Sequence, residues 1–264
     1  MLFRSTTIGW RFINKLMKEK YGVDSMPETA ENVATDFKIE REAQDRMALA
    51  SQMKAVAAQK AGVFDAEIIP VTLPQKKGDA IVVSRDEHPR ETSLEALAKL
   101  KGVVRPDGTV TAGNASGVND GACALILASE SEAARHGLTP RARVVGMATA
   151  GVAPRIMGIG PAPAIRLLLE RTGLTLDQIG RFEINEAQGA QTLAVGRDLG
   201  LDLTKLNVNG GAIALGHPLA ATGVRLTITL ARELRRAKLR WGISSACVGG
   251  GQGIALLIEN PEAA

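Results

Sequence analysis

Hydrophobic and polar positions follow two different patterns along this chain, and the change falls near residue 140. Up to that point, short periodic segments are separated by long polar connections. From Arg141 onward, β-branched runs alternate with segments of helical periodicity, which predicts a layered α/β domain. The expected strands are 142–148, 181–184, 242–246 and 253–259, and the expected helices are 161–171, 187–200 and 218–237.

The first region begins with a helix-start signal. Ser25 is followed three residues later by Glu28, with Pro27 in the first turn, which predicts a capping box and a helix to about Phe37. A second helix is expected over 40–61. Its apolar stripe would consist of Ala43, Met47, Ala50, Met53 and Ala57.

Shorter elements follow: extended pieces over 67–73 and 80–84, then a helix over 93–100. We therefore interpret residues 1–118 as a lid-like region of α+β character rather than a compact domain. Residues 121–136 favour a single helix, with Cys123 as a structural thiol on its buried face.

Composition narrows the class of protein. The 264 residues are 45% hydrophobic and carry a net charge of +4, as expected of a globular protein. We predict a cytoplasmic protein, because two distant cysteines give no disulfide framework and neither a signal peptide nor a membrane span is evident. Basic residues are dispersed without interleaved aromatics, so we expect no nucleic-acid partner. They form either a mildly basic surface or a cationic slot for an anionic cofactor.

Two glycine-rich loops contain side chains suited to proton transfer. His217 lies within Gly216-His217-Pro218, and Cys247 precedes three consecutive glycines and Gln252-Gly253. Glycines let a backbone approach a ligand closely, and His and Cys can move protons near neutral pH. Asn185 ends an apolar strand, where open α/β sheets bind ligands, and the alternative is that it caps a helix.

These segments resemble the thiolase family. Asn185-Glu186-Ala187, the run 210–218 and the motif starting at Cys247 are similar to its three C-terminal catalytic blocks. The run 109–121 resembles its hinge strand and substrate-contact turn, and 26–34 its lid helix. The pieces 6–12 and 87–90 are most similar to the branch that cleaves 3-oxoadipyl-CoA.

The resemblance implies roles for individual residues. Asn185 would fix a water that forms an oxyanion hole with His217, and Cys247 would exchange a proton beside the Gly249 N–H. No metal and no covalently bound cofactor are expected, because coenzyme A and acyl-CoA are the substrates. The expected contacts to substrate or CoA are Ser116, Ala112, Met26, Arg90 and Ala187.

The sequence also departs from the family. Gln188 replaces a Phe that normally lines the acyl pocket, and Ala220-Ala221-Thr222-Gly223 replaces Gly-x-Ser-Gly, so extra methyls could shift His217. Thiolases carry their nucleophilic cysteine in an N-terminal half, which we expect this chain to lack. The expected organisation is a lid (1–118), a helix of the N-terminal domain (119–140) and a C-terminal domain (141–264).

Three hypotheses follow. The first is a thiolase-type acyltransferase portion that acts on a 3-oxoacyl-CoA, as a homo-oligomer or together with an N-terminal half. The second is a catalytically inactive CoA-binding or partner-binding fragment. The third, an unrelated α/β cofactor domain, is disfavoured because no Gly-x-Gly-x-x-Gly opens a helix after a first strand.

Overall fold

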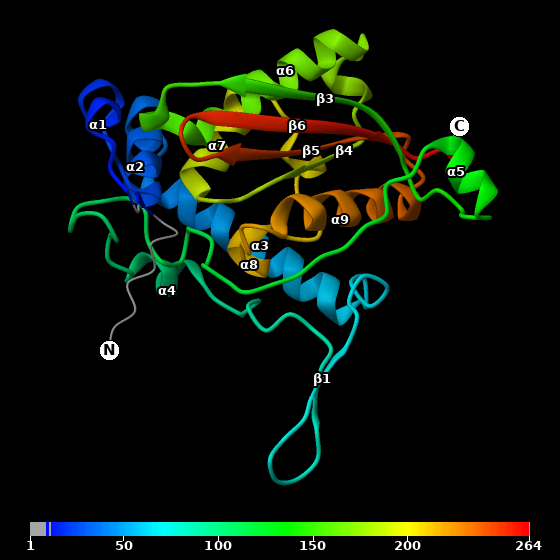
Figure 1. The fold of residues 1–264 in the computed structure, drawn as a ribbon. Coiled ribbons are helices and arrows are strands. Elements are labelled where there is room, and N and C mark those ends of the chain that lie inside the picture. Colours follow the sequence, from blue (N-terminus) through cyan, green and yellow to red (C-terminus); the bar gives the residue numbers. More distant parts are fainter. Residues whose placement is uncertain (1–8, 11, 264) are drawn as a thin grey trace.

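A mixed four-stranded sheet forms the centre of the computed structural model, which describes residues 9, 10 and 12–263 (Figure 1). The motif 6–12 therefore lies largely outside the described residues. The order across the sheet is β3 (Arg143–Gly151), β6 (Gln252–Glu259), β5 (Trp241–Val248) and β4 (Arg181–Ile184). The β4–β5 pair is parallel, and the two other pairs are antiparallel. All four strands coincide closely with the predicted ones.

Helices cover both faces of this sheet. One face packs against α6 (Pro161–Thr172), which is followed by α7 (Gly189–Leu199), and the other face carries α9 (Thr222–Arg236) beneath β4 and β5 (Figure 1). The largest core cluster lies between the sheet and α6–α7 and includes Ile165, Leu168, Phe182, Ile243 and Leu257, each at most 1% exposed. The predicted layered α/β class is confirmed.

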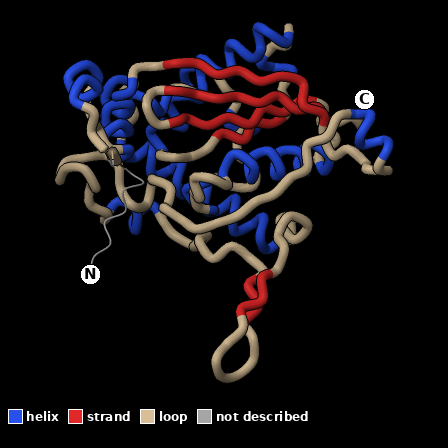
Figure 2. Tube along the Cα trace, in the orientation of Figure 1, coloured by secondary structure: helices blue, strands red, loops and turns tan. Residues whose placement is uncertain are grey.

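The lid-like region packs around one end of this domain. It contains four helices and two strands within 15–98: α1 (Lys15–Tyr21), α2 (Met26–Asp36), α3 (Arg41–Lys60), a hairpin of β1 (Val71–Leu73) and β2 (Ile81–Val83), and α4 (Leu94–Ala98). The hairpin projects away from the body of the molecule (Figure 2). The predicted capping box is present, with the Ser25 N–H donating to Glu28 Oε2 at 2.6 Å. The short helix α1 was not predicted.

The buried face of α3 differs from the predicted stripe. Met53 is 64% exposed, whereas Gln44, Gln52 and Ser51 are buried. These polar side chains are tolerated in the interior because they find partners: Gln52 Nε2 donates to the Ile213 carbonyl at 3.2 Å. The predicted stripe was wrong because hydrophobic periodicity cannot detect a helix face whose buried residues are polar and hydrogen-bonded.

The helix expected over 121–136 is wrong for most of its length. Only α5 (Glu130–Arg135) is helical, and Ser129 caps it. The preceding residues run as an extended segment across the α9 side of the domain (Figure 1). Ile126 and Leu127 are 82% and 78% exposed. A short apolar run is compatible with strand as well as helix, and here it is extended with no ladder partner among the described residues.

The prediction that Cys123 lies on the buried face of this helix is wrong as well. The thiol is exposed in this extended segment rather than packed on a helix. In the part of the chain that the structure describes, no helix is long and apolar enough to span a membrane.

Candidate active site

His217 sits on the turn between α8 (Ala212–Leu215) and α9. Gly216 has a φ of 95°, and a side chain there would overlap Asn119. The Asn119 amide oxygen accepts a hydrogen bond from the His217 N–H at 3.2 Å, so the segment 117–121 is bonded to this turn. The turn is thus fixed by local geometry and by one long-range contact.

The His217 ring has a partner at each nitrogen. Nδ1 lies 2.7 Å from Thr222 Oγ1, and Nε2 lies 3.4 Å from Asn185 Nδ2. Burial lowers the pKa of His217, and the positive charge of Arg225 lowers it further. The imidazole is therefore neutral near pH 7.

Asn185 follows β4 and is completely buried. Its N–H donates to the Ser245 carbonyl at 2.9 Å, which continues the β4–β5 pairing by one residue. Its Oδ1 accepts no hydrogen bond from the described residues. A buried amide oxygen without a donor costs about 1–3 kcal/mol, so this atom is suited to a donor supplied by water or substrate.

Cys247 occupies the penultimate position of β5, opposite Gly253 of β6. Parallel pairing brings the ends of β4 and β5 to the same edge of the sheet, so Cys247 is two residues past the residue that binds the Asn185 backbone. Burial raises the pKa of its thiol to about 12. At neutral pH this group is a protonated thiol, able to donate a proton but poorly suited to nucleophilic attack.

Backbone conformation and close packing explain most of the glycines that follow Cys247. Gly250 and Gly251 adopt φ values of 88° and 94°. Side chains at Gly251 and Gly253 would overlap the backbone of Val152–Pro154 and Gly160. Only Gly249 faces open space, and its N–H remains a predicted donor toward substrate.

Two of the predicted substrate contacts meet each other. Ser116 donates both its N–H, at 3.0 Å, and its hydroxyl, at 3.1 Å, to the Ala187 carbonyl. This pairing joins the 109–116 turn to the block that contains Asn185. Ala112 is exposed on that turn.

Met26 and Arg90 line separate hollows. Met26, at the start of α2, borders a small hollow together with Gly250 of the Cys247 loop. Arg90 is exposed on an open hollow of about 530 Å³ at the base of the β1–β2 hairpin, which Arg85 also lines. Met26 is therefore next to the Cys247 loop, whereas Arg90 borders a different opening.

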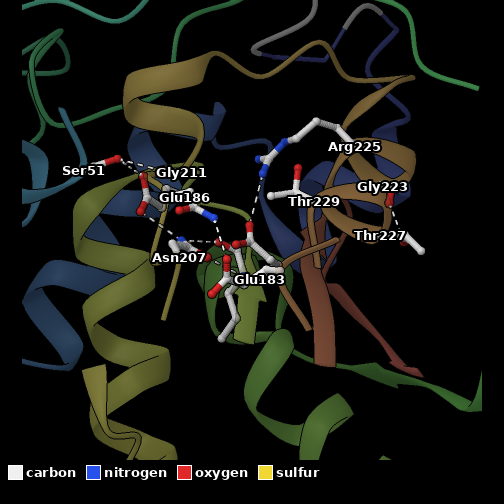
Figure 3. Close-up of polar contacts among 12 residues, drawn as sticks. Ser51, Glu183, Glu186, Asn207, Gly211, Gly223, Arg225, Thr227 and Thr229 are labelled. Atoms are coloured by element: carbon white, nitrogen blue, oxygen red, sulfur yellow. Dashed lines mark hydrogen bonds and ion pairs between the residues drawn. The ribbon is translucent and has the colours of Figure 1, made fainter. Parts of the chain in front are cut away.

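A buried carboxylate that sequence reasoning did not assign organises the His217 side of the site. Glu186 Oε2 accepts from Ser51 Oγ at 2.6 Å and from the Ile213 N–H at 3.3 Å, and Oε1 accepts from Asn207 Nδ2 at 2.9 Å (Figure 3). These bonds tie α3, β4 and α8 together just before His217. The sequence feature that could have indicated a role for Glu186 is its position between Asn185 and Ala187.

A second buried carboxylate lies on β4 toward α9. Glu183 pairs with Arg225 at 3.2 Å (Figure 3). Burial raises the pKa of Glu183 to about 8, and Arg225 partly opposes this rise. Arg225 therefore acts on both Glu183 and His217.

The fold and this arrangement define a member of the thiolase family. Residues 5–131 match the family model described as thiolase, N-terminal domain, and residues 138–260 match thiolase, C-terminal domain. The chain belongs to this family. The extended segment 119–129 thus falls within the part that matches the N-terminal domain.

Similar proteins include a protein named beta-ketoadipyl-CoA thiolase from Pseudomonas putida. It is 60% identical over 98% of this chain and 65% of its own length. A 3-oxoadipyl-CoA/3-oxo-5,6-dehydrosuberyl-CoA thiolase from Escherichia coli K12 is 56% identical, over 96% of this chain and 64% of its own length.

Among solved structures, the acetyl-CoA acetyltransferase of Bacillus anthracis superposes with a TM-score of 0.88 at 47% identity. The match covers 98% of this chain and 68% of that one. The chain spans about 65% of the length of the curated relatives it matches.

Proposed function

We propose that this chain supplies the CoA-binding and proton-transfer portion of a thiolase that cleaves 3-oxoadipyl-CoA with coenzyme A, giving acetyl-CoA and a shortened acyl-CoA, or runs the reverse condensation. The main support is the contact between His217 Nε2 and Asn185, whose buried Oδ1 has no donor among the described residues. The substrate class is taken from the printed names of the relatives.

The residues divide the chemistry as follows. Cleavage of the bond between the α- and β-carbons leaves an acetyl-CoA enolate, which must receive a proton at its α-carbon. The Cys247 thiol donates that proton, and the reverse reaction returns it. A water held by Asn185 and an N–H of His217 would stabilise the negative charge on the thioester oxygen.

The nucleophile is proposed to come from outside these 264 residues. Cys123 is exposed in the extended segment, and Cys247 has a raised pKa. Formation of an acyl-enzyme requires an activated thiolate, which neither environment provides. A second portion of a thiolase would provide it, and acyl-CoA thioesters are the small-molecule partners.

Mass spectrometry after incubation with acetyl-CoA tests this division. We expect the chain alone to bind acyl-CoA without gaining a covalent acetyl group. A stoichiometric acetyl adduct on Cys247 or Cys123 would show that the chain carries its own nucleophile. The alternative, a CoA-binding or partner-binding fragment without catalysis, predicts CoA binding that never leads to thiolysis, even when the remaining thiolase portion is supplied.

A further inference from the structure

The ring of His217 contacts a hydroxyl that is already committed as a donor. Thr222 Oγ1 donates to the Pro218 carbonyl at 2.9 Å, within the first turn of α9. The same oxygen lies 2.7 Å from His217 Nδ1. A hydroxyl has one hydrogen, and a carbonyl can only accept it, so the remaining lone pairs of Oγ1 face the ring.

The hydrogen between these two atoms must therefore come from Nδ1. In a neutral imidazole only one nitrogen carries a hydrogen, so Nε2 then presents a lone pair. Asn185 Nδ2 lies 3.4 Å from Nε2, and a donor at this place is compatible with a lone pair on Nε2. The contact with Thr222 is therefore the one that selects the tautomer.

We propose that Thr222 is a positioning residue that selects the Nδ1–H tautomer of His217, so that Nε2 acts first as a proton acceptor. The catalytic meaning rests on the proposed function: the nucleophilic thiol, which the remaining thiolase portion would supply, gives its proton to Nε2, leaving a thiolate and an imidazolium. Only then does Nε2–H donate to a thioester oxygen. Thr222 keeps accepting from Nδ1–H throughout and stabilises the charged ring.

The threonine at this position replaces the serine of the family pattern, and its hydroxyl contacts the ring. The additional methyl does not displace His217 from Asn185. One neutral hydrogen bond changes the ratio of two tautomers by about tenfold, which is sufficient to make one form dominant.

Ring-nitrogen NMR of the histidine-labelled chain reads the tautomer directly. The chain has three histidines, His88, His136 and His217, and a His217→Gln variant assigns the third signal. His88 is an internal reference, because its Nδ1 lies 2.8 Å from the Ala214 carbonyl and must be protonated there. We expect His217, like His88, to show a protonated Nδ1 and an unprotonated Nε2.

The variants isolate the hydroxyl. Thr222→Val should shift His217 toward the Nε2–H form that free histidine prefers, by about tenfold in population. Thr222→Ser should restore the Nδ1–H form. Thr227→Val is the matched control, because Thr227 makes the same bond to the carbonyl four residues earlier, on the exposed side of the same helix (Figure 3). It should leave the His217 spectrum unchanged.

Two results would overturn the proposal: a protonated Nε2 in the wild-type chain, or an unchanged tautomer in a folded Thr222→Val. If Thr222→Val does not fold, the wild-type and Thr222→Ser spectra decide, since both must show Nδ1–H. The spectra need no substrate, so they report the tautomer even if the chain takes no part in thiolysis. An unexpected tautomer would likewise leave the test of thiolysis unaffected.

Discussion

Ser51 and Glu186 are 135 residues apart in sequence, and the Ser51 hydroxyl donates to Glu186 Oε2 at 2.6 Å in the interior. The same Ser51 oxygen accepts the Gly211 N–H at 3.0 Å, so one hydroxyl joins α3 to β4 and to the segment before α8. Because α8 leads directly into His217, this small network links the lid-like region to the candidate active site.

Removing that hydroxyl should destabilise the chain. Ser51→Ala leaves Glu186 Oε2 without its strongest donor and the Gly211 N–H without an acceptor. We expect a loss of about 2–4 kcal/mol in the free energy of unfolding, measured by urea titration. Ser131→Ala, which removes an exposed hydroxyl in the first turn of α5, should change it by less than about 0.5 kcal/mol. Equal effects of the two substitutions would show that the Ser51 hydrogen bonds do not stabilise the folded chain.

Glu183 should make stability depend on pH. Its folded-state pKa is raised from 4.5 to about 8, so the folded chain binds this proton more tightly than the unfolded chain. The resulting stabilisation is complete below pH 4.5 and is lost as the pH rises toward 8. Urea titrations between pH 5 and 9 should show this decline, and Glu183→Gln, which cannot ionise, should flatten it. Parallel profiles for both proteins would contradict the assignment.

Arg90 should contribute a salt-sensitive part of CoA affinity. An exposed guanidinium that contacts a phosphate is screened by ions, so Arg90→Ala should weaken binding about twofold to fivefold at low salt and less at high salt. Calorimetry with CoA measures this. Arg46→Ala is the control, because Arg46 is also exposed but pairs with Glu42 on α3. If both variants bind as the wild type does, Arg90 does not contact CoA.

The two cysteines should differ in reactivity within one molecule. Partial burial raises the pKa of the exposed Cys123 thiol, and burial raises the pKa of Cys247 further, to about 12. Alkylation by iodoacetamide at pH 8 should therefore label Cys123 first, by about tenfold or more, since only the thiolate reacts. Peptide mass spectrometry follows both sites together, and faster labelling of Cys247 would refute the protonated-thiol role.

The isolated chain should self-associate. Met147 and Ile254 are 63% and 43% exposed on adjacent strands, and Leu127 is 78% exposed on the extended segment. Apolar surfaces of this kind drive association. Light scattering at micromolar concentration should show oligomers, and Met147→Glu should reduce them. Met53→Glu changes an equally exposed methionine, at 64%, on α3 and should have little effect. A monomeric wild-type chain would contradict this expectation.

Sequence reasoning succeeded where local chemistry determines local structure. The capping box at Ser25 and the strand that ends before Asn185 are both specified within a few residues. It failed where partners distant in sequence decide the outcome. The run around Cys123 is extended rather than helical, and Ser51 is buried by its bond to Glu186 rather than by its own hydrophobicity.

The candidate site shows the same division. The family motifs led to His217, Asn185 and Cys247, and the bond from Ser116 to Ala187 joins two predicted contacts. Sequence spacing carried no signal that Thr222 would approach the His217 ring, because that contact depends on where α9 begins.

Thiolysis by the reconstituted protein is the most direct test of the central claim. The chain would be mixed with the portion of the Pseudomonas putida relative that it does not match, and acetyl-CoA release from 3-oxoadipyl-CoA and CoA would be followed. We predict activity only when both portions are present, and a loss of at least about a hundredfold in His217→Gln and in Cys247→Ala, with CoA binding retained. Activity that survives both substitutions, or a mixture that binds CoA and never releases acetyl-CoA, would contradict the account.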